Sequence, residues 1–285
     1  MRIPKGGIGV FDSGIGGLTV LSECLKVCKN EVFYYYGDHT HAPYGNKPIK
    51  KIRRYTFAAM RKFRRLKVKA VVLACNTVTA VCAEELRRKF SFSIIGAEPA
   101  ILPAAKAGGT VYVLATRATC KSTRYKNLYR RASKLYPDTI VKTFCCNSLA
   151  GEIEVGIGDY IDYTAHLPPG KPDGVVLGCT HYIYIKKEIE KFYNCRAYDG
   201  NDGMAKRLVC VLEEGDLDKK RRFFRDLQPR LTTLHKFVKK LNKCSLKNRQ
   251  KSGKNEKEKK LFFLGKSRER MYFTYEQMFG LENKG

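Results

Sequence analysis

Two cysteines stand at matching places in two similar stretches of the chain. Ala70-Val-Val-Leu-Ala-Cys-Asn-Thr77 is echoed by Gly174-Val-Val-Leu-Gly-Cys-Thr-His181. In each stretch an apolar run typical of a buried strand ends at the cysteine, and a helix is expected to follow. The free backbone N–H groups of a helix N-terminus stabilise a thiolate and attract a carboxylate. The pattern therefore predicts two reactive thiols, Cys75 and Cys179, beside a carboxylate-binding site.

The alternative is that both cysteines are small core residues, which is the more common role of one cysteine at the end of an apolar strand. Two cysteines in echoed contexts favour a function instead. The polar residues beside them would be costly in a sealed core without partners; they are Asn76, Thr77, Thr180 and His181.

A glycine-rich turn follows the first apolar run, in Phe11-Asp-Ser-Gly-Ile-Gly-Gly-Leu-Thr19. It resembles a phosphate-binding turn but has neither the G-x-G-x-x-G spacing nor the lysine of a P-loop, so nucleotide binding is not favoured. Asp12 is a carboxylate that would hold an amino group or orient a thiol. Alternatively, Asp12 serves only as the N-cap of the following helix.

A polar loop, Gly37-Asp-His-Thr-His-Ala-Pro-Tyr-Gly-Asn-Lys-Pro48, is expected to line the same site. Its two histidines lack a third ligand at useful spacing, and the chain has no C-x-x-C pair. We therefore predict no metal site.

Short apolar runs alternate with helical patterns along the chain, which predicts an α/β fold with mainly parallel sheets. A second echo relates Gly7–Ser13 to Thr110–Thr116 at nearly the same offset as the cysteine segments, so two similar halves are expected to face each other. The expected strands are Gly7–Phe11, Val32–Tyr36, Ala70–Ala74, Ser93–Ile95, Thr110–Leu114 and Gly174–Leu177.

The net charge of +28 is concentrated toward the end of the chain. The segment 219–260 holds seventeen Lys or Arg and three acids. Such a block is usually solvated, and it would attract anionic substrates or bind polyanions nonspecifically. No apolar stretch is long enough to span a bilayer and no signal-peptide pattern begins the chain, so we expect a cytoplasmic protein with mostly reduced cysteines.

Four segments together resemble the signature segments of glutamate racemases, in the aspartate/glutamate racemase superfamily. They are Asp12-Ser-Gly-Ile-Gly-Gly-Leu-Thr19, Ala42-Pro-Tyr-Gly45, Ala74-Cys-Asn-Thr77 and Gly178-Cys-Thr-His-Tyr182. The resemblance covers about residues 7–208. It implies two pseudo-symmetric α/β domains with the active site at their interface. The first would comprise 1–97 plus 208–285, and the second 98–207.

The resemblance also implies roles for individual residues. Cys75 and Cys179 would be the two acid/bases, Cys75 acting on D-glutamate and Cys179 on L-glutamate. Asp12 would assist the first thiol, and His181 and Glu154 the second, with Glu152 left open as the alternative acid. Residues expected to hold substrate are Asp12, Ser13, Tyr44, Gly45, Asn76, Thr77, Thr116, Thr119, Cys179, Thr180 and His181.

Two thiols suit the reaction, because inverting a stereocentre by proton exchange needs a base on one face of the α-carbon and an acid on the other. A free thiol has a pKa near ~8.5, close enough to neutral for one to be ionised and the other not. The resemblance implies no pyridoxal phosphate and no metal. The resemblance also implies that the reaction supplies D-glutamate for peptidoglycan.

Two departures from the family pattern stand out. Ile183 replaces a proline that commonly follows the Thr-His-Tyr triplet, which is expected to change only the entry to the next helix, and the basic ending is unusual. Three alternatives stay open: an aspartate or broader amino-acid racemase, a nucleic-acid-binding protein on a racemase scaffold, and a homodimer in place of a monomer.

Overall fold

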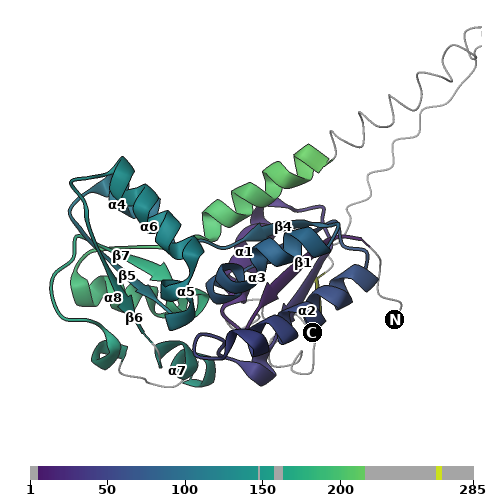
Figure 1. Ribbon diagram of the computed structural model, residues 1–285, viewed down its shortest axis with the longest axis horizontal. Coiled ribbons are helices and arrows are strands. Elements are labelled where there is room, and N and C mark those ends of the chain that lie inside the picture. Colours follow the sequence, from purple (N-terminus) through teal and green to yellow (C-terminus); the bar gives the residue numbers. More distant parts are fainter. Residues whose placement is uncertain (1–5, 147, 157–162, 216–260, 265–285) are drawn as a thin grey trace, which may run out of the picture.

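The computed structural model describes residues 6–146, 148–156, 163–215 and 261–264, which form two α/β halves side by side (Figure 1). The first half contains a five-stranded parallel sheet in the order β4-β3-β1-β2-β9. Its strands are β1 (Ile8–Asp12), β2 (Phe33–Gly37), β3 (Ala70–Leu73), β4 (Ser93–Gly96) and β9 (Leu261–Leu264).

The second half contains a four-stranded parallel sheet in the order β6-β5-β7-β8. Read from the other edge, this order is β8-β7-β5-β6, which matches β4-β3-β1-β2 strand for strand. The two-halved α/β fold with parallel sheets is thus confirmed. The strands are β5 (Thr110–Ala115), β6 (Ile140–Cys145), β7 (Gly174–Gly178) and β8 (Arg196–Tyr198).

Helices cover both faces of each sheet. The α-helices are α1 (Gly17–Val27), α2 (Ile49–Arg65), α3 (Asn76–Lys89), α4 (Ile101–Ala107), α5 (Arg117–Lys121), α6 (Thr123–Leu135), α7 (Leu149–Gly156), α8 (Lys186–Tyr193) and a helix over 201–215. Three short 3-10 turns are η1 (His39–His41), η2 (Tyr163–His166) and η3 (Thr180–Ile185). No helix in the described ranges is long and apolar enough to cross a membrane.

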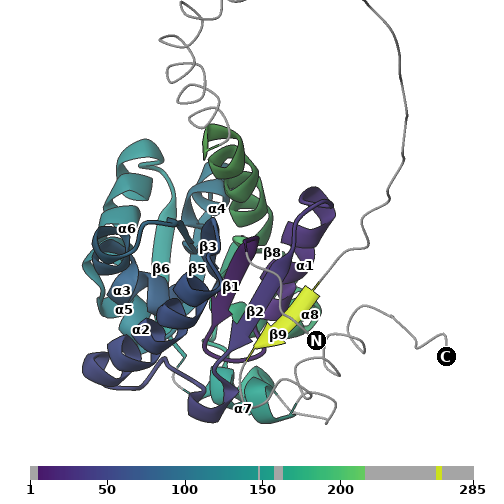
Figure 2. The same ribbon diagram turned by 90° about the vertical axis from the view of Figure 1, so that its right-hand side faces the viewer.

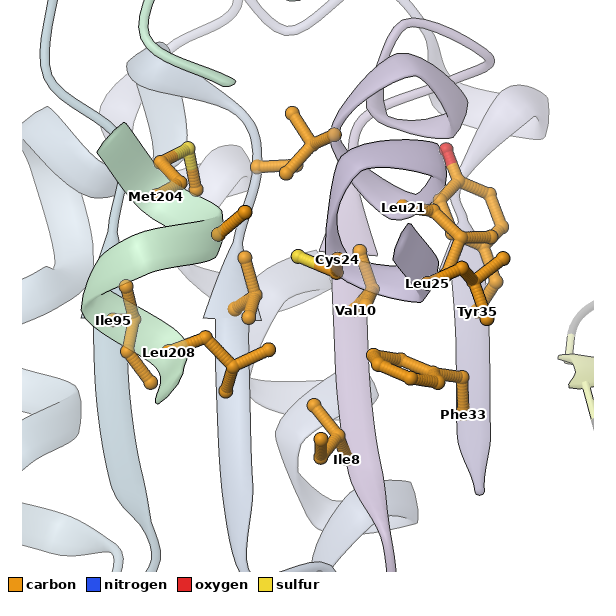
Figure 3. Packing of buried hydrophobic residues seen from close by; sticks show 14 of the residues in the cluster. Ile8, Val10, Leu21, Cys24, Leu25, Phe33, Tyr35, Ile95, Met204 and Leu208 are labelled. Atoms are coloured by element: carbon orange, nitrogen blue, oxygen red, sulfur yellow. The ribbon is translucent and has the colours of Figure 1, made fainter. Parts of the chain in front are cut away.

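The first sheet lies between two apolar layers. On one face, α2 buries Ile52, Met60 and Phe63, a spacing that gives this charged helix a single apolar stripe, against α3 and the sheet. On the other face, α1 and the helix over 201–215 pack together, and Figure 3 shows Met204 and Leu208 of that helix beside Ile95. The predicted boundary at 207/208 falls within this helix, whose contacts from Met204 onward are with the first half.

Three strands, β6, β8 and β9, had no counterpart among the expected ones, and all three lie at sheet edges. Figure 2 shows β9, in yellow, at the outer edge beside β2. The basic segment 219–260 lies outside the described residues. So does the run 271–275, Met-Tyr-Phe-Thr-Tyr, whose sequence would suit either an edge strand or a docking segment.

Candidate functional site

Cys75 and Cys179 follow equivalent strands of the two sheets, β3 and β7. Each strand pairs with the first strand of its half, β1 or β5, so both thiols stand at the carboxyl edge of a parallel sheet, where open α/β sheets bind their ligands. The helix after Cys75 is the expected α-helix, α3. After Cys179 the chain instead forms the 3-10 turn η3 before α8 begins at Lys186.

The environment of Cys75 keeps its thiol protonated. Burial, followed by the nearby Asp12 carboxylate, raises the pKa of Cys75 to about 12, although Ser13 and the backbone N–H of Val78 act in the opposite direction. The hydroxyl of Ser13 lies 3.5 Å from the Cys75 sulfur. A negative charge on Cys179 also raises the pKa of Cys75, which means that the two thiols share one electrostatic environment.

Asp12 makes hydrogen bonds in both halves. It ends β1 and is completely buried, which raises its pKa, although charge on His181 opposes this effect. One carboxylate oxygen accepts the backbone N–H of Gly14 at 2.9 Å, and the other accepts the hydroxyl of Thr180 at 3.1 Å. A single carboxylate therefore reaches from β1, the neighbour of the strand that precedes Cys75, to the residue after Cys179.

A chain of contacts leads away from Cys179. Its sulfur lies 3.6 Å from Nδ1 of His181, whose Nε2 lies 2.5 Å from Oε2 of Glu154. Burial alone would lower the pKa of His181, but its contacts with Cys179 and Glu154 outweigh burial and hold that pKa well above its usual value. His181 is therefore an imidazolium beside the thiol, a neighbour that stabilises a thiolate.

Glu154 is the carboxylate at the end of this chain. Burial would raise its pKa, but hydrogen bonds from His181, His39 and the backbone N–H of Ile15, the last at 3.0 Å, lower it overall. Glu152, two residues earlier, points elsewhere and pairs with His166 at 2.7 Å. Of the two acids that the sequence left open, only Glu154 reaches His181.

His39 is a site residue that the sequence reasoning missed. Its Nδ1 contacts Oε1 of Glu154 across the two halves. From the sequence this loop was expected only to line the site, and no spacing rule links positions 115 residues apart. His41 instead contacts Asp38, which also accepts the hydroxyl of Tyr44 at 2.5 Å. The Tyr44 hydroxyl is thus occupied within its own loop.

Three threonines form a second bridge between the halves. The hydroxyls of Thr77 and Thr116 lie 2.8 Å apart, and those of Thr116 and Thr119 lie 3.1 Å apart. Gly45 closes against this group, since the backbone N–H of Ala118 donates to its carbonyl at 3.4 Å. Thr116 also caps α5.

Asn76 has an unmet hydrogen-bonding group. It is the first residue of α3, and its side-chain oxygen is buried without a hydrogen-bond partner among the described residues. A buried carbonyl oxygen of this kind costs free energy until a donor reaches it. A ligand N–H or O–H next to Cys75 would supply that donor.

Two positions in the turn after β1 require glycine because residues of the opposite half lie directly against them. A Cβ on Gly14 would lie 2.2 Å from Oε2 of Glu154, and one on Gly16 would lie 2.4 Å from Oγ1 of Thr180. Any side chain at either position would hold the halves apart. The turn thus provides a close approach between two sheets.

Residues 8–208 match the Asp/Glu/hydantoin racemase family. The chain belongs to this family. Two curated relatives are glutamate racemases: that of Clostridium acetobutylicum is 36% identical over 228 residues, covering 76% of this chain and 88% of the relative. That of Leptospira interrogans is 38% identical over 214 residues, covering 72% and 82%.

Solved structures of racemases are also similar. The Escherichia coli glutamate racemase in complex with L-glutamate and the activator UDP-MurNAc-Ala is 30% identical, with a TM-score of 0.64 over 74% of this chain and 83% of that chain. The Thermus thermophilus glutamate racemase, in complex with β-chloro-D-alanine, is 31% identical with a TM-score of 0.59, over 76% and 84%.

The site of this racemase-family protein is closed. Cys75 and Cys179 are 5% and 8% exposed, and neither lines the cavities of about 1220 and 530 Å³. The smaller of these cavities is lined by Gly45 but not by Thr116. The described residues contain no cluster of three or more His, Cys, Asp or Glu side chains arranged for a metal, and their ten cysteines are free thiols.

Proposed function

We propose that the chain interconverts L- and D-glutamate by passing protons between Cys75 and Cys179. The observation that supports this proposal is the pair of contacts made by Asp12 and Ser13. Ser13 lies 3.5 Å from the Cys75 sulfur, and Asp12 accepts the hydroxyl of Thr180, the residue after Cys179, at 3.1 Å. Because the two thiols also follow equivalent strands, we propose that they act on one bound amino acid from opposite sides.

The charges around the two thiols define the resting state. The pKa of about 12 leaves Cys75 protonated, and the scheme requires Cys179, 3.6 Å from Nδ1 of His181, to act as the base. In this state Cys179 removes the α-proton of L-glutamate, and the electron pair left on the α-carbon spreads into the carboxylate. Cys75 then donates its proton to the opposite face, which yields D-glutamate and exchanges the roles of the thiols.

The polar groups around the thiols would orient the substrate and stabilise the developing negative charge. Preorganised donors in a closed site are the strongest such device, because water does not compete with them. Asp12, with its raised pKa, lies beside Cys75 and would orient that thiol or meet the ammonium group. The groups proposed to hold glutamate are Ser13, Tyr44, Gly45, Asn76, Thr77, Thr116, Thr119, Thr180 and His181.

Substrate entry requires the halves to separate. The described structure brings them together at Asp12–Thr180, Ile15–Glu154 and Thr77–Thr116. Helix α3 also packs against α5 and α6 of the second half, so opening has to break these hydrogen bonds and separate part of this packing. Closure around glutamate would then exclude water from the carbanionic transition state.

The choice of glutamate rests on the curated relatives and on the L-glutamate in the Escherichia coli structure. The direct test is formation of D-glutamate from L-glutamate by the purified protein, without added pyridoxal phosphate and with EDTA present, with L-aspartate as a parallel substrate. Turnover of aspartate at a higher kcat/KM than glutamate would overturn the substrate assignment. Inhibition by EDTA would overturn the proposal that no metal takes part.

The thiols are tested by substitution. Cys75→Ser and Cys179→Ser should each reduce racemisation in both directions by at least about 10³-fold, because a serine hydroxyl is a far weaker acid/base at neutral pH. The control is Cys210→Ser, at an exposed position on the helix over 201–215, which should turn over normally. Near-normal turnover by either site variant would overturn the two-thiol scheme.

A further inference from the structure

The charge of the described residues is divided between two sets of helices. The helices α2, α3, α5 and α6 carry eighteen Lys or Arg and only two acids, Glu84 and Glu85. In contrast, α1, α7, α8 and the helix over 201–215 carry six Lys or Arg and eight acids. The basic character of the folded part therefore belongs to one set of helices rather than to the whole surface.

The basic helices form one continuous layer across both halves. In the first half α2 contacts α3, and α3 in turn contacts α5 and α6 of the second half. Figure 2 shows these four helices gathered on one side, with α1 and α8 on the other. We call the eighteen Lys and Arg side chains of α2, α3, α5 and α6 the basic face; seventeen of them are exposed and Arg124 is partly buried.

Most charges of the basic face have no acidic partner among the described residues. Arg53 and Lys89 share the carboxylate of Glu85, and Arg124 pairs with Glu98. The other cations of the four helices make no ion pair with a described residue. Like charges held together in this way repel one another and weaken the fold, so an anionic partner would stabilise the arrangement.

A groove opens within the basic face. The cavity of about 530 Å³ lies between the loop at 45–49, α3, α5 and the start of α6. It is lined by Lys47, Arg117, Lys121 and Arg124, with Glu84 as the acid of the lining. The face therefore combines a broad basic surface with a central depression at the junction of the two halves.

We propose that the basic face binds the phosphate backbone of nucleic acid. Eleven of its eighteen cations are arginines, whose planar guanidinium groups bind phosphate through two hydrogen bonds. With 17 residues, α2 alone is about 25 Å long, enough to follow roughly seven base pairs of a duplex. Phosphate contacts of this kind carry affinity without reading sequence.

An acidic membrane fits the face less well. Stable attachment of a helix to a bilayer uses apolar side chains that enter the interface. On α2 the apolar stripe is buried in the core, and the exposed large apolar side chains of the four helices are Ile49, Tyr129 and Leu135, near or at helix ends except for Tyr129. The face thus offers charge without an apolar anchor.

The test uses the full-length protein and a fluorescein-labelled 20-bp DNA duplex or 20-nucleotide RNA, with anisotropy measured from 50 to 300 mM NaCl. The variant Lys50→Ala/Lys51→Ala/Arg61→Ala/Arg65→Ala removes four exposed α2 cations that have no ion pair with a described residue. Since log K falls with log salt at about 0.9 per phosphate contact, losing four contacts should reduce the slope by roughly 3 to 4 and weaken binding at least tenfold.

The matched control removes the same charge from the opposite side, as Lys187→Ala/Lys191→Ala/Lys206→Ala/Arg207→Ala, all at exposed positions. It should change affinity by less than about threefold. Equal weakening by the two variants would mean that only net charge matters, and would overturn the proposal. The fold of each variant is checked by circular dichroism and thermal unfolding, which do not depend on the proposed racemase activity.

Two further results would overturn it. Binding that survives the α2 variant but is lost on replacing Lys251, Lys254, Lys257 and Lys259 by alanine would assign it to the basic segment 219–260 instead. The protein could also bind phosphatidylserine vesicles more tightly than either nucleic acid and lose that binding in the α2 variant. This result would make the basic face a membrane contact. Because binding is measured without glutamate, these outcomes are independent of the proposed racemase activity.

Discussion

His181 lies between Cys179 and Glu154, with one ring nitrogen 3.6 Å from the sulfur and the other 2.5 Å from the carboxylate. Contacts with Cys179 and Glu154 together raise the pKa of His181, so the ring is an imidazolium. Glu154, which does not touch Cys179, thus helps to set the charge of the residue beside that thiol.

We expect Glu154→Gln to reduce kcat by about 10²-fold, since a neutral amide no longer holds His181 as an imidazolium. The change is isosteric, so the fold should remain. The matched control is Glu152→Gln, which removes an exposed partner of His166 and should leave kcat within about twofold. A larger loss at position 152 than at 154 would contradict the assignment.

The free energy of unfolding should depend on pH through the ion pair of His181 and Glu154. The pKa of His181 is raised on folding, so its contribution is fully present below its unfolded pKa of 6.5 and is lost as pH rises through the folded value. The pKa of Glu154 is lowered, so its contribution is present above 4.5 and is lost as pH falls through the folded value. The pair is therefore most stabilising between those two values.

His181→Gln tests this expectation by urea unfolding from pH 3 to pH 9. The variant should lose roughly 3 kcal/mol of unfolding free energy between pH 4.5 and 6.5, with a smaller difference at both extremes. The partly exposed pair of His166 and Glu152 gives the comparison, and His166→Gln should change the free energy of unfolding by under about 0.5 kcal/mol. A difference that does not vary with pH would contradict the ion pair.

His39 should act on activity through Glu154. Removing its hydrogen bond in His39→Ala takes away one cause of the lowered pKa of Glu154, so the acid limb of the kcat profile should move to higher pH. We expect kcat at neutral pH to fall about tenfold with little change in KM. His166→Ala is the control, and an unshifted acid limb would exclude a positioning role for His39.

Gly16→Ala should allow each half to fold but prevent the two halves from closing fully on each other. Its Cβ would lie 2.4 Å from Thr180 Oγ1 and 2.9 Å from the backbone N of His181, so the halves could not close fully. A misplacement of about 1 Å costs roughly 10² in rate. Gly203→Ala is the control, because a Cβ there meets nothing within 4 Å. Equal activity in the two variants, measured beside thermal unfolding, would argue against closure at this turn.

The two-thiol scheme also predicts how hydrogen isotopes exchange. With L-glutamate in D₂O, the D-glutamate formed should carry deuterium from its first appearance, because Cys75 exchanges its proton with solvent before substrate binds. The remaining L-glutamate should keep its α-hydrogen at early times. Deuterium entering L-glutamate as fast as D-glutamate appears, followed by NMR, would indicate a single base on one face.

Strands buried on both faces could be predicted from the sequence, because β1, β3, β5 and β7 are nearly continuous apolar runs. Two of the missed edge strands, β6 and β8, lack that signal. In β6, for example, Val141 is the one buried residue, and Lys142 and Thr143 interrupt the apolar residues. In contrast, β9 is an apolar run of four residues that was overlooked because it directly follows the basic segment. The 3-10 turn after Cys179 was missed for a different reason, since the helical spacing continues into α8 and hides the tighter first turn.

The site was predictable where chemistry is local to a motif, as for the cysteines and Asp12. It was not predictable where two distant segments meet. Nothing in the glycine turn indicates that Gly14 faces Glu154, because that contact exists only after both halves have folded and closed. The same holds for His39, which reaches Glu154 from a loop in the other half.

The position of β9 has a consequence for how the chain is made. It is the outer neighbour of β2, yet its residues 261–264 leave the ribosome more than two hundred residues later. The second sheet, in contrast, is complete once residue 198 has emerged. The second half, although it is translated later, therefore has all the described strands of its sheet first. In the first half, the outer edge of β2 stays without its partner β9 until residues 261–264 have emerged.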